Sequence, residues 1–302
     1  MQRSYGRDFW LSLRMIVALG IVGLIYLAAE AIMLAVTIGA AAEGNVGAAL
    51  GGLMFACAIV VGLVAQIRKP EGLILRTARA RLLEPGEERE LQALVQRVAA
   101  QADLSEPRVA LIHSWAPNAL TAARKPETAV VAVTTELLRR LEPKELEAVV
   151  AHELAHVANR DGPVMTFVSG PAMALSAFWH SDDSRAKVSY ILLFWITIPL
   201  HVITLLLMWT VSRYREYAAD RGSALITGAP QDLISALVKI EGSAPPRSDL
   251  RGGLAVNAFC IVSGRNRWRR VELVMDHPPV QKRIRRLEAL ARELGKAVAR
   301  WG

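Results

Sequence analysis

Two histidines four residues apart, with a glutamate directly after the first, are the residues of this chain whose spacing could do chemistry: His152, Glu153 and His156. On an α-helix, residues four apart lie on one face, so both imidazoles can bind the same metal ion. Glu153 lies one step round the helix, where its carboxylate can act on a metal-bound water without being a ligand. The pattern predicts a catalytic zinc site. The alternative is a pair of buried, hydrogen-bonded histidines.

The residues around this motif predict the helix that it needs. Pro143 suits a first helical turn, and the acidic residues beside it favour the positive end of a helix dipole. Residues 159–162 (Asn-Arg-Asp-Gly) are expected to end the helix. Apolar residues recur between them at helical spacing: Leu146, Val149, Val150, Leu154 and Val157.

A catalytic zinc uses three protein ligands, so a third ligand is expected elsewhere. Residues 212–220 continue a long apolar segment as a helix and place Glu216 and Asp220 on one face. Glu216 can bind the metal, while Asp220 can accept a hydrogen bond from a ligand imidazole and fix its tautomer. The alternative is a solvated helix in which Arg215, Glu216 and Arg221 are surface residues.

Taken together, these motifs resemble the HtpX-type membrane zinc metalloproteases, which are kin of the CAAX prenyl endopeptidases. The resemblance covers about residues 70–290 and implies that His152, His156 and Glu216 bind one Zn²⁺ ion while Glu153 is catalytic. The matching pieces, in chain order, are residues 117–119 ahead of 130–134, 152–156 followed by 159–161, 212–213 leading into 216–220, and 276–279 ahead of Arg283 and Leu287.

The resemblance also implies that the substrates are polypeptides, membrane proteins among them, and that misfolded or damaged membrane proteins are degraded. Asn118 is a candidate for holding the substrate main chain, although a turn-forming role for residues 117–118 explains it equally well. The family usually has Asn-Ala-Phe here, with a glycine a few residues later. This chain has Leu120 and Ala123 in those places, which leaves the role of this loop open.

The negative oxygen that forms during peptide hydrolysis needs a donor besides the metal. His277 is the first candidate, because the CAAX-endopeptidase kin place a histidine of a similar His-Pro-Pro segment near the zinc. Tyr217 and Arg213 are alternatives. The competing interpretation of His277 is a loop histidine stacked on Pro278.

Four apolar segments are long enough, or nearly so, to cross a bilayer: about 15–38, 47–67, 163–179 and 190–211. The third is short and carries Gly170 and Pro171, so a re-entrant segment is its alternative.

Basic residues before the first segment, after the second and after the fourth predict, by the positive-inside rule, that both termini and the site are cytoplasmic. A mainly α integral membrane protein of the inner or plasma membrane is therefore expected, with about four transmembrane helices and a cytoplasmic α+β zincin-type metalloprotease domain that carries a small β-sheet.

The expected organisation alternates between membrane and protease segments. Residues 1–67 form one membrane hairpin and 163–211 a second, while 68–162 and 212–302 form the two parts of the protease domain. Within that domain we expect an amphipathic helix at 87–101, strands near 109–113 and 129–133, and a basic helix at about 279–299. The strand at 129–133 is a candidate edge on which an extended substrate adds.

Composition limits the other classes of function. The net charge of +8 lies largely beside the apolar segments, where lipid headgroups are the nearer partner, so nucleic acid is not expected. Two cysteines far from any metal pattern fit a reducing compartment without disulfides. A transporter would need more spans. The remaining alternative is a membrane scaffold or chaperone-like binder with a structural zinc, although such sites usually have four protein ligands and no need of Glu153. The oligomeric state stays open.

Overall fold

The chain divides into two compact units in the computed structural model. One comprises Met1–Arg7, Lys69–Val164 and Ser212–Gly302, and the other comprises Asp8–Arg68 and Met165–Val211. The structure describes residues 9–47, 50, 53, 75–76, 78–165, 191–241 and 278–295. The first unit contains the sheet and every described residue of the expected site.

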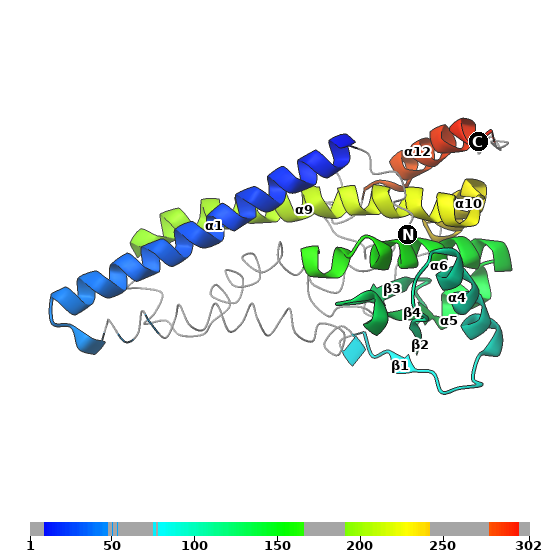
Figure 1. Ribbon diagram of the computed structural model, residues 1–302, viewed down its shortest axis with the longest axis horizontal. Coiled ribbons are helices and arrows are strands. Elements are labelled where there is room, and N and C mark those ends of the chain that lie inside the picture. The colour runs from blue at the N-terminus through cyan, green and yellow to red at the C-terminus, as the bar shows by residue number, and fades with distance from the viewer. Residues whose placement is uncertain are drawn as a thin grey trace. The chain divides into compact units, whose positions relative to one another are not determined.

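A four-stranded sheet lies at the centre of the first unit (Figure 1). Its strands follow the order β1-β2-β4-β3, with β2 parallel to β4 and the outer strands antiparallel to their neighbours. Nearly every side chain of β2, β3 and β4 is buried, because both faces of the sheet are covered. The strands are β1 (Arg81–Leu82), β2 (Arg108–Ile112), β3 (Ala119–Ala122) and β4 (Val130–Thr134).

The expectation that residues 129–133 form an edge strand is wrong. This segment is β4, which pairs with β2 on one side and β3 on the other. The described edges of the sheet are β1 and β3. β3 has only four residues, Ala-Leu-Thr-Ala, so it is too short and too poor in β-branched residues to be recognised from its pattern.

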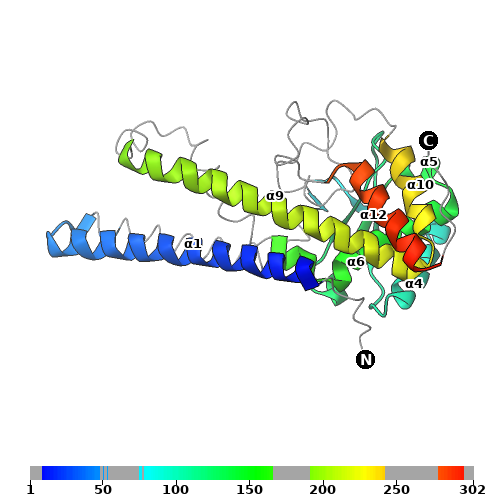
Figure 2. The same cartoon turned by 90° about the horizontal axis from the view of Figure 1, so that it is seen from above.

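Helices cover the face of the sheet that Ala119, Val131 and Val133 share (Figures 1 and 2). The motif helix α6 packs against β3, α4 and α10, and α12 packs against α10. The predictions of helices near 87–101 and 279–299 are confirmed, each with a shorter helix. The described helices of this unit, together with a 3-10 turn, are α4 (Arg89–Gln101), η1 (Pro126–Thr128), α5 (Thr135–Arg140), α6 (Pro143–Ala158), α10 (Pro230–Glu241) and α12 (Val280–Glu293).

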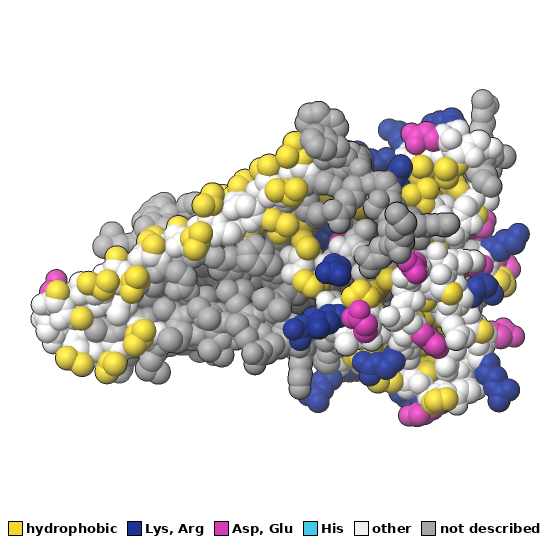
Figure 3. Space-filling model, in the orientation of Figure 1, with side chains coloured by type: hydrophobic (Ala, Val, Ile, Leu, Met, Phe, Trp, Pro, Cys, Tyr) yellow, Lys and Arg dark blue, Asp and Glu magenta, His cyan; other side chains and the backbone are white. Residues whose placement is uncertain are grey.

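Two long helices complete the described chain: α1 (Phe9–Ala42) and α9 (Ile191–Thr227). Figure 3 shows mainly hydrophobic side chains along α1, while charged side chains gather over the unit that contains the sheet. Among the described residues, no helix combines the length and the apolar character needed to cross a membrane. The expected spans at 47–67 and 163–179 lie almost entirely outside the described residues.

Candidate active site

Helix α6 places His152 and His156 one turn apart, with their ring centroids 4.8 Å from each other. The helix begins at Pro143, and the side chain of Glu145 accepts a hydrogen bond from the backbone N–H of Glu142 at 2.8 Å. Ten of its sixteen residues are buried, Glu153 among them. The prediction of a helix that carries both histidines is confirmed.

Helix α9 brings Glu216 to the two histidines because α9 and α6 approach very closely. A Cβ at Gly222 would lie 2.5 Å from the Cβ of Ala155, so only glycine permits this contact. One turn of α9 away from Glu216, Asp220 also faces α6. Ser223 Oγ donates a hydrogen bond to the carbonyl of Ala148 at 2.7 Å, which fixes the register of the two helices.

The side chains of His152, His156 and Glu216 meet in a way that could hold a metal ion. The Nε2 atom of each imidazole lies 3.5 Å from one carboxylate oxygen of Glu216, and all three ligand atoms lie within 4.8 Å of one another. Tetrahedral ligands with bonds of about 2.0–2.1 Å stand about 3.4 Å apart, so this donor set fits zinc. Since Arg215 and Glu216 are only 4% and 3% exposed, the solvated-helix alternative is wrong.

The Nδ1 atom of His152 lies 3.1 Å from Asp220 Oδ1, which leaves Nε2 to face Glu216. Arg283 from α12 holds Asp220 in turn, with Nε–Oδ2 and Nη2–Oδ1 distances of 2.8 and 2.5 Å. Arg283 Nη1 also lies 3.2 Å from Glu216 Oε2. Burial lowers the pKa of His152, but its hydrogen bonds to Asp220 and Glu216 more than offset this and raise the pKa to about 9. A metal that binds Nε2 must therefore displace a proton from the imidazolium, while Asp220 accepts the proton that stays on Nδ1.

His156 has a similar arrangement on its own Nδ1 atom, which lies 2.6 Å from Asp161 Oδ2. A carboxylate can only accept, so Nδ1 donates and Nε2 is left toward Glu216. Arg215 places its Nε 3.2 Å from the same Asp161 oxygen. The turn that allows Asp161 to reach back includes Arg160 in the left-handed region at φ 57°.

Glu153 is 2% exposed and points toward strand β3. Alternation along β3 puts Ala119 and Thr121 on the face that α6 covers. Thr121 Oγ1 donates a hydrogen bond to Glu153 Oε2 at 2.8 Å. Burial raises the pKa of Glu153, although the neighbouring histidines oppose the shift. A carboxylate with a raised pKa beside metal ligands is suited to accept a proton.

Four other residues were expected at the site: Asn118, His277, Tyr217 and Arg213. The side chain of Asn118 accepts a hydrogen bond from Ala119 N at 3.0 Å, and its backbone bonds to Thr134, so Asn118 stands directly before β3. His277 lies outside the described residues. Tyr217 and Arg213 are half-buried, and neither lines the pocket beside Glu153 and His156.

The sequence interpretation assigned no role to four residues that the structure brings to this site: Thr121, Asp161, Arg215 and Arg283. Asp161 and Arg283 do stand in the segments that carry the family resemblance, and this position could have identified them as site residues. Arg215 is adjacent to Glu216, which was a weaker signal. Thr121 had none, because its importance depends on β3, whose pattern does not predict a strand.

Comparison with known proteins agrees with this geometry. Residues 85–291 match the family model described as Peptidase family M48. A protein named Protease HtpX homolog from Moorella thermoacetica is 38% identical over 307 aligned positions, which cover 97% of this chain and 99% of the relative. Protease HtpX homolog 1 from Streptomyces coelicolor is 35% identical, with 99% of each chain covered.

Among solved structures, the crystal structure of S. mikatae Ste24p aligns with a TM-score of 0.47 and 17% identity, covering 89% of this chain and 66% of that one. The family model matches more than half of the sequence, and the relatives match nearly all of it. This chain belongs to peptidase family M48 and is a metalloprotease.

Proposed function

We propose that this protein is an endopeptidase that carries one zinc ion per chain, held by His152, His156 and Glu216. The observation that carries the proposal is the convergence of two imidazole Nε2 atoms on the two oxygens of one carboxylate, each at 3.5 Å. Two histidines and a glutamate form a known catalytic zinc set, with a fourth position left for water or substrate. Zinc bound there would polarise the scissile carbonyl and lower the pKa of water.

Glu153 is the proposed general base. Its carboxylate takes a proton from the attacking water as the water oxygen bonds to the carbonyl carbon. The same carboxyl group then gives the proton to the amide nitrogen as the carbon–nitrogen bond breaks. The hydrogen bond from Thr121 at 2.8 Å fixes one carboxylate oxygen, and the buried surroundings that raise the pKa of Glu153 favour its protonated form between these two steps.

Strand β3 is the proposed docking edge for the substrate. It lies at the edge of the described sheet, and its Thr121 touches the proposed base. An extended polypeptide that pairs its backbone with β3 would carry a peptide bond past Glu153. Asn118, proposed from the sequence to hold the substrate main chain, stands where β3 begins. Backbone pairing is tolerant of side chains, which suits the degradation of many different proteins.

We also propose that the protein acts at the cytoplasmic face of a membrane, on misfolded or damaged membrane proteins. Apolar segments and flanking basic residues in the sequence support this orientation. On α1, large apolar side chains are widely exposed, with Ile16, Leu24 and Leu27 at 62%, 66% and 68%. Apolar surface of this extent is typical of a segment that meets lipid or another protein.

The test is cleavage of an unfolded, fluorescently labelled polypeptide by the full chain purified in detergent. We expect cleavage that a zinc chelator stops and added zinc restores. Glu153→Gln should keep its zinc and fold but lose at least about a hundredfold in turnover, because the amide cannot accept the proton. Glu147→Gln is the matched control, since Glu147 lies on the same helix and, among the described residues, forms an ion pair with Arg97 alone, on the surface.

Equal turnover by Glu153→Gln and the unchanged protein would overturn the proposed mechanism. Zinc retention without any cleavage by the unchanged protein would favour the scaffold or chaperone-like binder, in which the metal is structural.

A further inference from the structure

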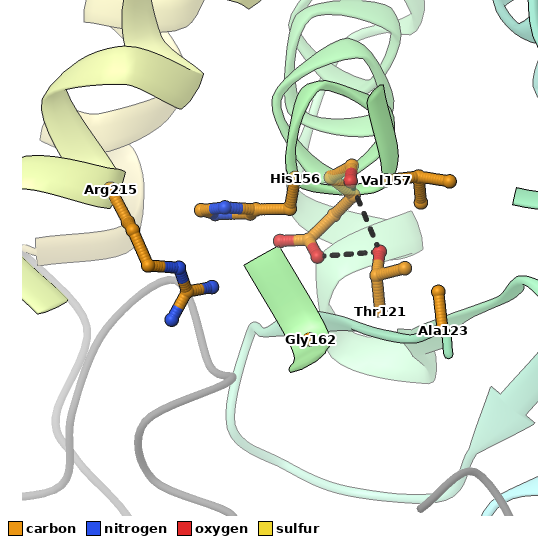
Figure 4. A pocket seen from close by; sticks show the side chains of 7 residues that line it. Thr121, Ala123, His156, Val157, Gly162 and Arg215 are labelled. Carbon is orange, nitrogen blue, oxygen red and sulfur yellow. Dashed lines mark hydrogen bonds between the residues drawn. The ribbon is translucent and has the colours of Figure 1, made fainter. Parts of the chain in front are cut away.

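A small pocket opens beside the proposed base and one proposed metal ligand (Figure 4). Ala123, Val157 and Gly162 form its apolar wall, and a Cβ at Gly162 would lie 2.1 Å from the Ala123 carbonyl oxygen. Its polar lining consists of Thr121, Glu153, His156 and Arg215. A peptide group that reacts between the base and the metal ligands must occupy or border this space.

Arg215 is the one cation among these lining residues, and it is only 4% exposed. Its Nε atom lies 3.2 Å from Asp161, the carboxylate that orients His156. Within the described part of the chain, no hydrogen bond or ion pair joins its two terminal nitrogens to another residue. Figure 4 shows its guanidinium group across the pocket from Thr121. A buried guanidinium whose terminal N–H groups have no acceptor among the described residues is suited to bind an oxygen atom of the substrate.

We propose that Arg215 is a catalytic residue of the peptidase reaction, whose terminal N–H groups donate to the scissile carbonyl oxygen as that oxygen becomes negative. The inference rests on the proposed function and adds a second source of positive charge to the metal. The ion pair with Asp161 holds the guanidinium in place beforehand, so little reorganisation is needed when the charge develops. The proton of the attacking water still goes to Glu153, and Arg215 stays protonated throughout.

The two other described candidates for this donor, Tyr217 and Arg213, are less well placed. The ring of Tyr217 is covered by the guanidinium of Arg286, 3.8 Å from its centroid. Arg213 does not line the pocket. His277 lies outside the described residues, so its role as a donor stays a prediction from the sequence. Among the described candidates, only Arg215 combines a pocket-lining position with a contact to the group that orients a metal ligand.

The test uses the full chain in detergent with saturating zinc and two probes of the same sequence, a peptide substrate and a phosphinic peptide that mimics the tetrahedral, negatively charged state. For Arg215→Met we expect kcat to fall about a hundredfold while KM changes less than about threefold. The inhibition constant of the phosphinic peptide should weaken by a factor similar to the loss of kcat/KM. Arg215→Lys keeps the charge beside Asp161 and should recover part of both losses.

Asp161→Asn is the comparison variant, because it removes the same ion pair but leaves the guanidinium in the pocket. It should release zinc more easily, and at saturating zinc its preference for the phosphinic peptide over the substrate should fall by less than about tenfold, because the guanidinium stays in the pocket but is no longer held by the ion pair. A merely structural role for Arg215 would make the two variants behave alike.

The inference is overturned if zinc-loaded Arg215→Met, or Arg215→Lys should Arg215→Met not fold, keeps kcat within about threefold of the unchanged protein. It is also overturned if substrate and phosphinic peptide lose affinity equally, or if Arg213→Met produces the selective loss instead. The proposed function fails separately, when Glu153→Gln retains full turnover.

Discussion

Each of the two proposed imidazole ligands is backed by a carboxylate and an arginine, but the two sets differ in burial and in origin. His152, Asp220 and Arg283 are all 2% exposed or less, and they join α6, α9 and α12. In the other set the side chain of His156 is 12% exposed, while Asp161 and Arg215 are 3% and 4% exposed. Its carboxylate lies five residues further along the chain, and Arg215 reaches the pocket.

This difference indicates that the set behind His152 mainly stabilises the fold, whereas the set behind His156 mainly serves the proposed reaction. A charged set that is cut off from water stabilises the fold only while every member is present, because removing one leaves another charge buried without compensation. The set behind His152 therefore ties α12 to the proposed metal site. The set behind His156 borders the pocket, where solvent and substrate can reach it, so its changes should affect function more than folding.

Arg283→Met should have the largest effect on stability. It leaves Asp220 and Glu216 buried without their cation, so we expect the free energy of unfolding to fall by about 3–5 kcal/mol and zinc to be lost with it. The measurement is denaturant unfolding in detergent, with zinc content by mass spectrometry. Arg286→Met, on the exposed side of the same helix, should cost less than about 1 kcal/mol, since within the described part of the chain it removes an exposed contact with Tyr217. Equal losses in both variants would contradict the structural role.

Asp161→Asn should have a smaller effect on folding and a distinct effect on metal binding. The amide no longer fixes His156 through a charged hydrogen bond, so zinc affinity should fall about 10- to 100-fold. Titration against a zinc-binding dye measures the affinity, and the unfolding experiment supplies the comparison. If Asp161→Asn unfolds as easily as Arg283→Met, the two sets do not differ in the way that their burial indicates.

Glu145→Gln calibrates the comparison with a partly exposed ion pair that joins α6 to α10. Lys239 and Ser235 donate to Glu145 at 2.8 and 2.6 Å, and the Lys239 side chain is 38% exposed. We expect a loss of about 1 kcal/mol at pH 7. Burial opposes the shift, but the bonds from Lys239, Ser235 and the Glu142 backbone keep the pKa of Glu145 below 4.5.

A lowered folded-state pKa stabilises the protein above the unfolded value of 4.5, and that stabilisation is lost as the pH falls through the folded pKa. Unfolding curves of both proteins at neutral pH and below pH 4.5 measure this. The difference between them should shrink in acid. A difference that stays constant with pH would show that the charge of Glu145 contributes nothing.

The sequence by itself determined the parts of the site that depend on helical periodicity. The spacing of His152 and His156, the start of α6 at Pro143, and the shared face of Glu216 and Asp220 all follow from hydrogen bonds between residues four apart. Such bonds are local, so neighbouring residues are enough to predict them. The apolar runs of β2 and β4 were equally readable, because strands buried on both faces are continuously apolar.

Only the tertiary structure decided which charged groups stand behind the histidines and which strand forms the edge. Asp220 and Arg283 meet across 63 residues of sequence, and Thr121 meets Glu153 across 32. Partners of this kind depend on how whole elements pack, which is set by many apolar contacts and by close approaches such as that of Gly222 to Ala155. No local period encodes such packing, so the sequence could name these residues without pairing them.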